Sequence, residues 1–201
     1  MQIRIYNYQD GVRKLGPGIR FVLWTQGCQR RCKGCMTPMS RDMNGGKPFE
    51  TSELSEMIIK SNREGITISG GEPFLQAKEL CDLIDKVREH ADVGVIIYTG
   101  YTFEELKECN EEYRLKLLEK TDLLIDGPYI DELNDGKKLR GSSNQRALLL
   151  TERYRDHVND YGSGKAEVEF FVKEDKVVMV GVPDKDVFDR FRNVYEEENN
   201  E

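Results

Sequence analysis

The stretch IRFVLWTQGCQRRCKGC (residues 19–35) joins an apolar run to three closely spaced cysteines. Its first part, residues 19–26, is mostly apolar or β-branched and predicts a buried strand. Cys28, Cys32 and Cys35 follow directly. Three thiolates on one short loop can hold three irons of a [4Fe-4S] cluster and leave the fourth iron open to another molecule. We therefore predict an iron–sulfur loop at the carboxyl end of a strand.

A zinc site or a disulfide framework explains these cysteines less well. A structural zinc site typically takes four Cys or His ligands in two short-spaced pairs, and the other cysteines, Cys81 and Cys109, are far from the loop and from each other. Five cysteines are an odd number, and the 201-residue chain begins without a secretory segment. We therefore expect reduced thiols and a cytoplasmic location.

The composition favours one globular domain with a small appendage. A chain of 201 residues is long enough to bury a substantial core. Charged residues make up 33% of the chain and the net charge is -7, so a broad nucleic-acid surface is not expected. The longest apolar runs, such as residues 177–182, are too short to cross a bilayer. We therefore expect neither a nucleic-acid partner nor a membrane.

Strand and helix patterns alternate along the chain after the cysteine loop. Further strands are predicted at residues 66–69, 93–99 and 123–125, and helices at residues 53–60, 75–90 and 103–119. This alternation predicts an α/β fold around a mostly parallel sheet. Thr51 or Ser52 is expected to cap the first helix and Gly65 to end it.

Glycine and polar residues follow each predicted strand. The loops are Ser69-Gly70-Gly71-Glu72-Pro73, Tyr98-Thr99-Gly100-Tyr101 and Asp126-Gly127-Pro128. Parallel α/β sheets bind ligands at the carboxyl ends of their strands, so these loops and the cysteine loop are predicted to form one pocket. Gly70 and Gly71 let the backbone come close to a ligand. The Asp126 carboxylate would suit a ligand ammonium group.

These motifs together resemble the radical S-adenosylmethionine (SAM) superfamily, in which a Cys-x3-Cys-x2-Cys loop follows one strand and Gly-Gly-Glu-Pro the next. They further resemble the small activating enzymes of glycyl-radical proteins, most closely those that activate anaerobic ribonucleotide reductases. The similarity extends over roughly residues 1–147. It is carried by Gly16-Pro17-Gly18-Ile19-Arg20, Gln26-Gly27-Cys28, Cys32-Lys33-Gly34-Cys35, Tyr98-Thr99-Gly100-Tyr101, Glu104-Glu105-Leu106, Leu124-Ile125-Asp126-Gly127 and Arg140-Gly141-Ser142-Ser143-Asn144-Gln145.

The resemblance implies two cofactors, a [4Fe-4S] cluster and SAM, and residues that would bind them. The three irons with protein ligands would be held by Cys28, Cys32 and Cys35. The methionine amino group of SAM would be lined by Gly70, Gly71, Glu72 and Asp126, with Thr99 as a weaker candidate, and the adenosine by Gly34 and Met36. The resemblance also implies an incomplete parallel βα barrel of the partial TIM type, because the chain has too few βα units for eight.

The activity implied by the resemblance is reductive cleavage of SAM to a 5′-deoxyadenosyl radical, with an electron from flavodoxin or ferredoxin. In this family the radical takes hydrogen from a glycine on a large partner, here an anaerobic ribonucleotide reductase. Met36-Thr37-Pro38 differs from the residues that many of these activators carry after the third cysteine. This difference leaves open the modification of a peptide or small molecule. An iron–sulfur electron-transfer or redox-sensing protein is a third alternative, which the strand-end glycines and Asp126 disfavour.

The resemblance fades near Ala147, and we expect three parts: a radical SAM core (1–150), a linker (151–166) and a C-terminal unit (167–201). The C-terminal unit is predicted to be a β-hairpin followed by a helix, from its strand-like and helix-like patterns. It could cover the open side of the sheet or dock a partner. The glycines at residues 161–164 predict a hinge and favour docking.

Overall fold

The computed structural model of the chain describes residues 1–173 and 176–198. Within these ranges the strands form a seven-stranded sheet in the order β3-β1-β2-β4-β5-β6-β7 and a two-stranded sheet of β8 and β9. The strands are β1 (Gln2–Val12), β2 (Arg20–Thr25), β3 (Lys47–Glu50), β4 (Gly65–Gly70), β5 (Gly94–Tyr98), β6 (Leu123–Asp126), β7 (Arg146–Leu149), β8 (Val168–Lys173) and β9 (Lys176–Gly181). The α-helices are α1 (Thr51–Ser61), α2 (Ala77–Arg88), α3 (Phe103–Glu108), α4 (Glu112–Glu119) and α5 (Lys185–Glu198). The 3-10 helices are η1 (Pro38–Arg41), η2 (Pro73–Gln76), η3 (Asp131–Leu133) and η4 (Glu152–Asp160).

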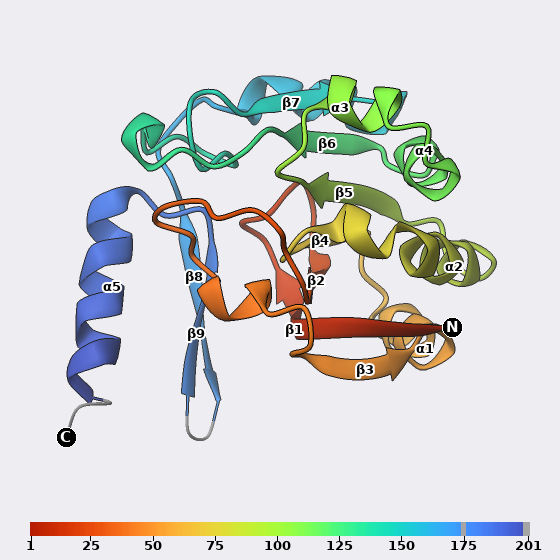
Figure 1. Cartoon of the computed structure of the whole chain (residues 1–201), viewed down its shortest axis with the longest axis horizontal. Coiled ribbons are helices and arrows are strands. Elements are labelled where there is room, and N and C mark those ends of the chain that lie inside the picture. Colours follow the sequence, from red (N-terminus) through yellow and green to blue (C-terminus); the bar gives the residue numbers. More distant parts are fainter. Residues whose placement is uncertain (174–175, 199–201) are drawn as a thin grey trace.

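The central strands of the large sheet run parallel. β2 pairs with β4, β4 with β5 and β5 with β6 in parallel register, so their carboxyl ends lie along one edge. β1, β3 and β7 extend the sheet with antiparallel pairs. The sheet is open, with β3 and β7 as its outer strands (Figure 1). The predicted α/β class with a mostly parallel sheet is confirmed.

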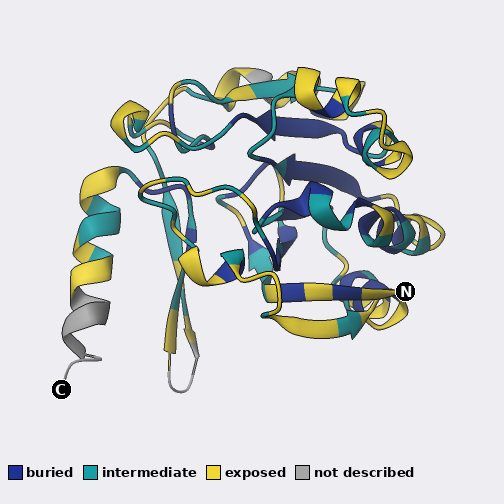
Figure 2. Ribbon diagram, viewed as in Figure 1, coloured by how far each residue is buried: buried dark blue, intermediate teal, exposed yellow. Residues whose placement is uncertain are grey.

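One face of the sheet packs against α1, α2 and α4. Strand residues such as Leu23, Ile68 and Ile97 are fully buried there, together with Leu54 of α1 and Leu83 of α2. Figure 2 shows β5, β6 and the inner sides of the neighbouring helices as buried. This apolar layer stabilises the strands and thereby fixes the positions of the loops at their carboxyl ends.

The opposite face of the sheet is covered by the C-terminal segment. Val22 of β2 lies in one apolar cluster with Val12, Leu15, Val180 of β9 and Val182. Val180 is 1% exposed and Val182 is 9% exposed. The hairpin is therefore part of the core, which favours the covering role over docking.

Residues 151–166 are packed against the core rather than extended as a linker. Tyr154 of η4 is buried, and its hydroxyl accepts a hydrogen bond of 2.8 Å from the buried Arg20. The Gly162 N–H donates to the Lys138 carbonyl at 3.0 Å. The glycine-rich part expected to be a hinge is thus tied to a neighbouring loop.

The start of α1 differs from the prediction. Neither Thr51 nor Ser52 is the N-cap: Glu50 occupies that position and makes no side-chain capping bond. The Thr51 hydroxyl instead donates to Asp82 of α2. The hydroxyl is used between two helices because both pack on the same face of the sheet.

The helix ends differ as well. Asn62, with φ of 51°, ends α1 in the left-handed region, whereas Gly65 begins β4. The stretch predicted as one helix over residues 103–119 divides into α3 and α4, and Asn110 between them has φ of 52°. Asparagine tolerates this conformation better than most residues, so it can break a helix where glycine is absent.

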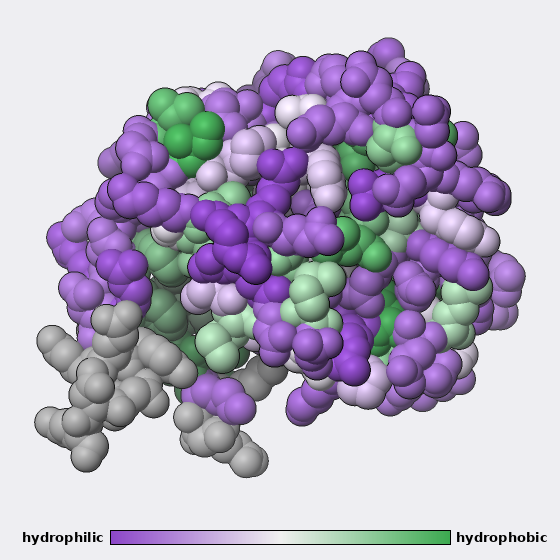
Figure 3. Space-filling model, in the orientation of Figure 1, coloured by the Kyte–Doolittle hydropathy of each residue, from purple (hydrophilic) through white to green (hydrophobic). Residues whose placement is uncertain are grey.

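The face of the hairpin that points away from the sheet is apolar and partly exposed. Phe170 is 54% exposed, Val172 82% and Val177 49%. Figure 3 shows a mostly hydrophilic surface with several apolar areas, one of them between α5 and the hairpin. Among the helices that the structure describes, none is long and apolar enough to cross a membrane.

The two faces of the hairpin give a test of its role in stability. Val180→Ala should lower the free energy of unfolding by about 1–3 kcal/mol, because it removes buried methyl groups from the cluster around Val22. Val172→Ala, on the exposed face of the same hairpin, should change it by less than about 0.5 kcal/mol. Urea unfolding, followed by circular dichroism, measures both. Equal effects of the two changes would show that the hairpin is not part of the folded core.

Candidate functional site

The loops after β2 and β4 meet through direct backbone contacts. The Gly71 N–H donates to the Thr25 carbonyl, and the Glu72 N–H donates to the Gly27 carbonyl, both at 2.8 Å. A Cβ atom at Gly71 would clash with the Gly27 backbone. Glycine is therefore required here for the approach of two chain segments, and a side chain at Gly71 would displace the start of the cysteine loop.

A support that the sequence analysis missed lies beneath this loop. The Gly27 N–H donates to the Ser40 carbonyl at 2.8 Å, and the Cys28 N–H donates to the Arg41 carbonyl at 3.2 Å. The buried Gln26 amide also donates to the Asp42 carbonyl at 2.7 Å. The segment around η1 thus fixes the backbone that enters the loop. No motif in residues 38–42 indicated this role.

Cys28, Cys32 and Cys35 are free thiols, each partly exposed. In the part of the chain that the structure describes, no three Cys, His, Asp or Glu side chains are gathered tightly enough to hold a metal ion. Burial raises the pKa of the Cys28 thiol; the Arg30 N–H lowers it, and the nearby Glu72 and the other two cysteines raise it further. Three free thiols on one short loop suit an iron–sulfur cluster, whose binding would draw them together.

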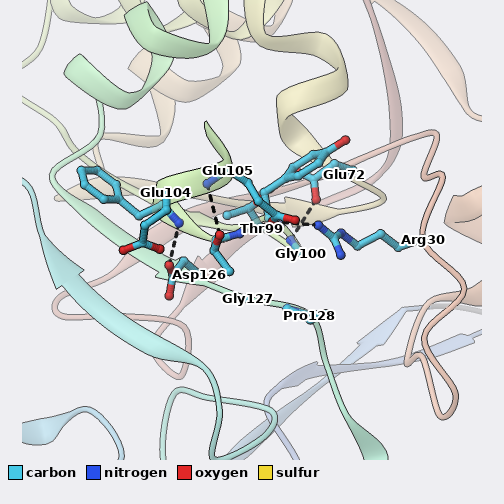
Figure 4. Close-up of polar contacts among 12 residues, drawn as sticks. Arg30, Glu72, Thr99, Gly100, Glu104, Glu105, Asp126, Gly127 and Pro128 are labelled. Carbon is cyan, nitrogen blue, oxygen red and sulfur yellow. Dashed lines mark hydrogen bonds and ion pairs between the residues drawn. The ribbon is translucent and has the colours of Figure 1, made fainter. Parts of the chain in front are cut away.

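Glu72 and Thr99 are brought together by the fold. Glu72 is 2% exposed to solvent, and burial raises the pKa of its carboxyl group. Its carboxylate accepts hydrogen bonds from the Thr99 hydroxyl and the Gly100 N–H, both at 2.8 Å (Figure 4). It also accepts from the Phe74 N–H at 3.1 Å. Glu72 therefore joins the loop after β4 to the loop after β5.

Asp126 is buried at the end of β6 and has a cationic partner. Its carboxylate accepts from the Phe103 N–H at 2.8 Å and from the Arg146 guanidinium, with Nε at 3.0 Å. Arg146 also pairs with Glu104 at 2.7 Å, and both carboxylates raise the pKa of the guanidinium. A ligand ammonium would share Asp126 with this arginine. Arg146 was not among the predicted site residues; the β6–β7 register places it opposite Asp126.

Gly34 and Met36 stand on either side of the third cysteine, Cys35. A Cβ atom at Gly34 would lie 2.5 Å from the Asp131 carboxylate, so this part of the loop packs against the segment after β6. Met36 is 37% exposed. Gly70, with φ of 106°, completes the close packing on the β4 side, because its Cβ atom would clash with the Thr25 backbone. Cys28, the glycines and Glu72 after β4, Thr99 and Asp126 thus lie at the carboxyl ends of the parallel strands.

Known proteins resemble most of this chain. Residues 14–148 match the model of a family described as 4Fe-4S single cluster domain. The anaerobic ribonucleoside-triphosphate reductase-activating protein of Enterobacteria phage T4 is 34% identical over 148 residues, 71% of this chain and 91% of that protein. The protein of that name from Escherichia coli (strain K12) is 31% identical over 140 residues, 65% of this chain and 88% of its own length. The pyruvate formate-lyase-activating enzyme of Clostridium pasteurianum is 34% identical over 130 residues, 61% of this chain and 50% of its own length.

The cysteine loop makes a direct prediction about iron. After anaerobic reconstitution, the protein should bind about four irons per chain, and Cys32→Ala should lose most of them, because two thiolates do not retain a cubane cluster. Cys109→Ala, outside the loop, should bind iron as the unchanged protein does. Iron analysis and visible absorption give both results. A single tightly held zinc would contradict the prediction.

Proposed function

Because the chain belongs to the 4Fe-4S single cluster domain family, among the radical SAM activators of glycyl-radical enzymes, we propose that it activates an anaerobic ribonucleotide reductase. The observation that carries this proposal is the three-thiol loop at the same sheet edge as the Glu72 loop, within the matched residues. Its cofactors are a [4Fe-4S] cluster and SAM. The chain spans nearly all of the phage reductase activator but half of the Clostridium enzyme, which favours a reductase as the partner.

We assign the cofactor contacts to the strand-end residues. The cluster ligands would be Cys28, Cys32 and Cys35, and the contacts to SAM would be Gly34, Met36, Gly70, Gly71, Glu72, Thr99 and Asp126. When bound, the two cofactors supply a 5′-deoxyadenosyl radical through one-electron reduction and cleavage of SAM. The partly exposed backbone at Gly70 and Gly71 would accept hydrogen bonds from a ligand amine, and Asp126 would add negative charge at the same sheet edge.

The buried polar bonds around Glu72 keep this edge in one geometry. Glu72 accepts from Thr99 and Gly100, so the loop after β5 cannot move independently of the loop after β4. A site held in this way needs little rearrangement when a ligand binds. The apolar layers on both faces of the sheet exclude water from beneath it, which protects a reactive radical from side reactions.

The electron donor is proposed to be flavodoxin or ferredoxin. Arg31 is exposed between the first two cysteines, where it would face an acidic protein. The partner that receives the radical would be a large glycyl-radical protein, approaching the same edge of the sheet. Electrostatic attraction between Arg31 and an acidic electron donor would increase their association rate, especially at low salt.

We further propose that the large sheet is a partial TIM-type barrel, in which β2, β4, β5 and β6 are the parallel unit. The radical SAM core would comprise residues 1–150, joined through residues 151–166 to the unit of residues 167–201. The burial of Val180 supports the view that this last unit covers the core.

Electron paramagnetic resonance tests the proposed partner. The reconstituted protein, mixed with SAM, a reductant and an anaerobic ribonucleotide reductase, should produce a glycyl-radical doublet on the reductase, and Cys32→Ala should produce none. Deoxyadenosine should also form slowly without the reductase. If no glycyl-radical protein gives the doublet while a peptide or small molecule is modified, the protein is a modifying enzyme instead.

The Glu72–Thr99 bond predicts a specific defect in SAM binding. Thr99→Val removes a donor from the buried carboxylate and should raise the KM for SAM about tenfold, while iron content stays unchanged. Thr99→Ser retains the hydroxyl and should restore most of the affinity. Deoxyadenosine production at varied SAM concentration measures both. Identical kinetics for Val and Ser would exclude a role for the bond.

A further inference from the structure

Arg30 lies in the cysteine loop midway between Cys28 and Cys32, yet its side chain contacts a different part of the sheet edge. The guanidinium carbon is 4.7 Å from the centre of the Tyr101 ring. One of its nitrogens is 3.2 Å from the Glu105 carboxylate in the first turn of α3. Figure 4 shows Arg30 extending toward the segment of Gly100 and Glu105. One side chain therefore connects the cysteine loop to the segment that follows β5.

The segment that receives Arg30 is shaped to accommodate it. Gly100 has no side chain, and a Cβ atom there would lie 2.5 Å from the Arg30 Cδ. The Glu105 carboxylate is held by the Thr102 N–H at 2.7 Å, in a capping box that begins α3. The Glu105 carboxylate can therefore pair with the Arg30 guanidinium, and the missing side chain at Gly100 leaves space for the Arg30 side chain.

The Tyr101 ring of this segment contacts a second arginine as well. The Arg114 guanidinium carbon is 5.1 Å from the centre of the same Tyr101 ring. A planar guanidinium over an aromatic ring is more favourable than an ammonium group, because it combines electrostatic attraction with stacking. The contact between Arg30 and Tyr101 therefore depends on the chemical type of the residue as well as on its charge.

The other basic residues of the loop behave differently. Arg31 donates to the Cys28 carbonyl at 2.9 Å and to the Arg30 carbonyl at 3.0 Å, so its bonds remain inside the loop. Lys33 pairs with Glu132 at 3.0 Å, but its side chain is 78% exposed. Exposed ion pairs contribute little to stability. Among the basic side chains between the first and third cysteines, Arg30 combines ring stacking, an ion pair and close packing.

We propose that Arg30 is a positioning residue that holds the segment between Cys28 and Cys32 against Tyr101 and Glu105. It restrains the backbone between the first two thiols before the cluster binds and would keep a positive charge, paired with Glu105, in the loop that holds the cluster. The consequence for the cluster rests on the proposed function, whereas the contact itself belongs to the chain without cofactors. A fixed cation favours the more negative, reduced cluster and so raises its reduction potential.

Hydrogen exchange of the cofactor-free protein tests the contact. Arg30→Gln should make the amides of residues 29–34 exchange about tenfold faster, because the loop opens more often. Tyr101→Leu should have a similar effect, and the double variant should exchange no faster than either single variant, since the two residues act in one contact. Lys33→Gln is the matched control and should leave exchange unchanged. Unchanged exchange in Arg30→Gln, or fully additive effects in the double variant, would overturn the proposal.

The reduction potential of the reconstituted protein provides the second measurement. It should fall in Arg30→Gln and stay close to the original value in Lys33→Gln. Arg30→Lys should have a reduction potential close to that of the unchanged protein, because an ammonium group keeps the charge. Its amide exchange should be intermediate between those of the unchanged protein and Arg30→Gln, because the planar stacking is lost. A potential change without faster exchange in Arg30→Gln would show that Arg30 acts by charge alone, against the proposal. If exchange responds as expected but the unchanged protein never cleaves SAM, the proposed function fails and the positioning role stands.

Discussion

The candidate site depends on the close approach of two backbones, at the ends of β2 and β4. Glu72 donates its N–H to the Gly27 carbonyl at 2.8 Å, and a Cβ atom at Gly71 would clash with that same residue. Gly27 directly precedes the first cysteine of the loop, so this contact fixes where the loop begins. It also places the Glu72 side chain, through which the loop after β5 is held in turn.

Two buried carboxylates at this edge have different surroundings. Glu72 accepts only from neutral donors among the described residues, the Thr99 hydroxyl and two backbone N–H groups, and burial raises the pKa of its carboxyl group. Asp126 instead faces the Arg146 guanidinium, which offsets its charge. Glu72 is thus suited to holding loops together, and Asp126 to sharing its charge with a cationic group.

The part of the chain beyond the family match is integrated with the core. The matched region ends at residue 148, yet Arg20 within it donates to Tyr154 beyond it, and Val22 packs with Val180. Residues outside the match therefore complete the second apolar face of the sheet. An open sheet with one bare apolar face would be prone to association, so a cover of this kind has a clear physical benefit.

The sequence alone determined β2, β4, β5 and β6, since buried parallel strands are continuous apolar runs, and it predicted the cysteine loop at a strand end. It did not predict β1, β3 or β7. β1 alternates buried and exposed residues only at its start and then carries polar residues, and β3 and β7 are only four residues long. The partnership of Asp126 with Arg146 depends on the β6–β7 register, and that of Arg30 with Tyr101 and Glu105 on two loops meeting. Local patterns report whether a residue is buried and in which element; which side chains meet was decided by tertiary structure, because strand order and register bring together residues far apart in the chain.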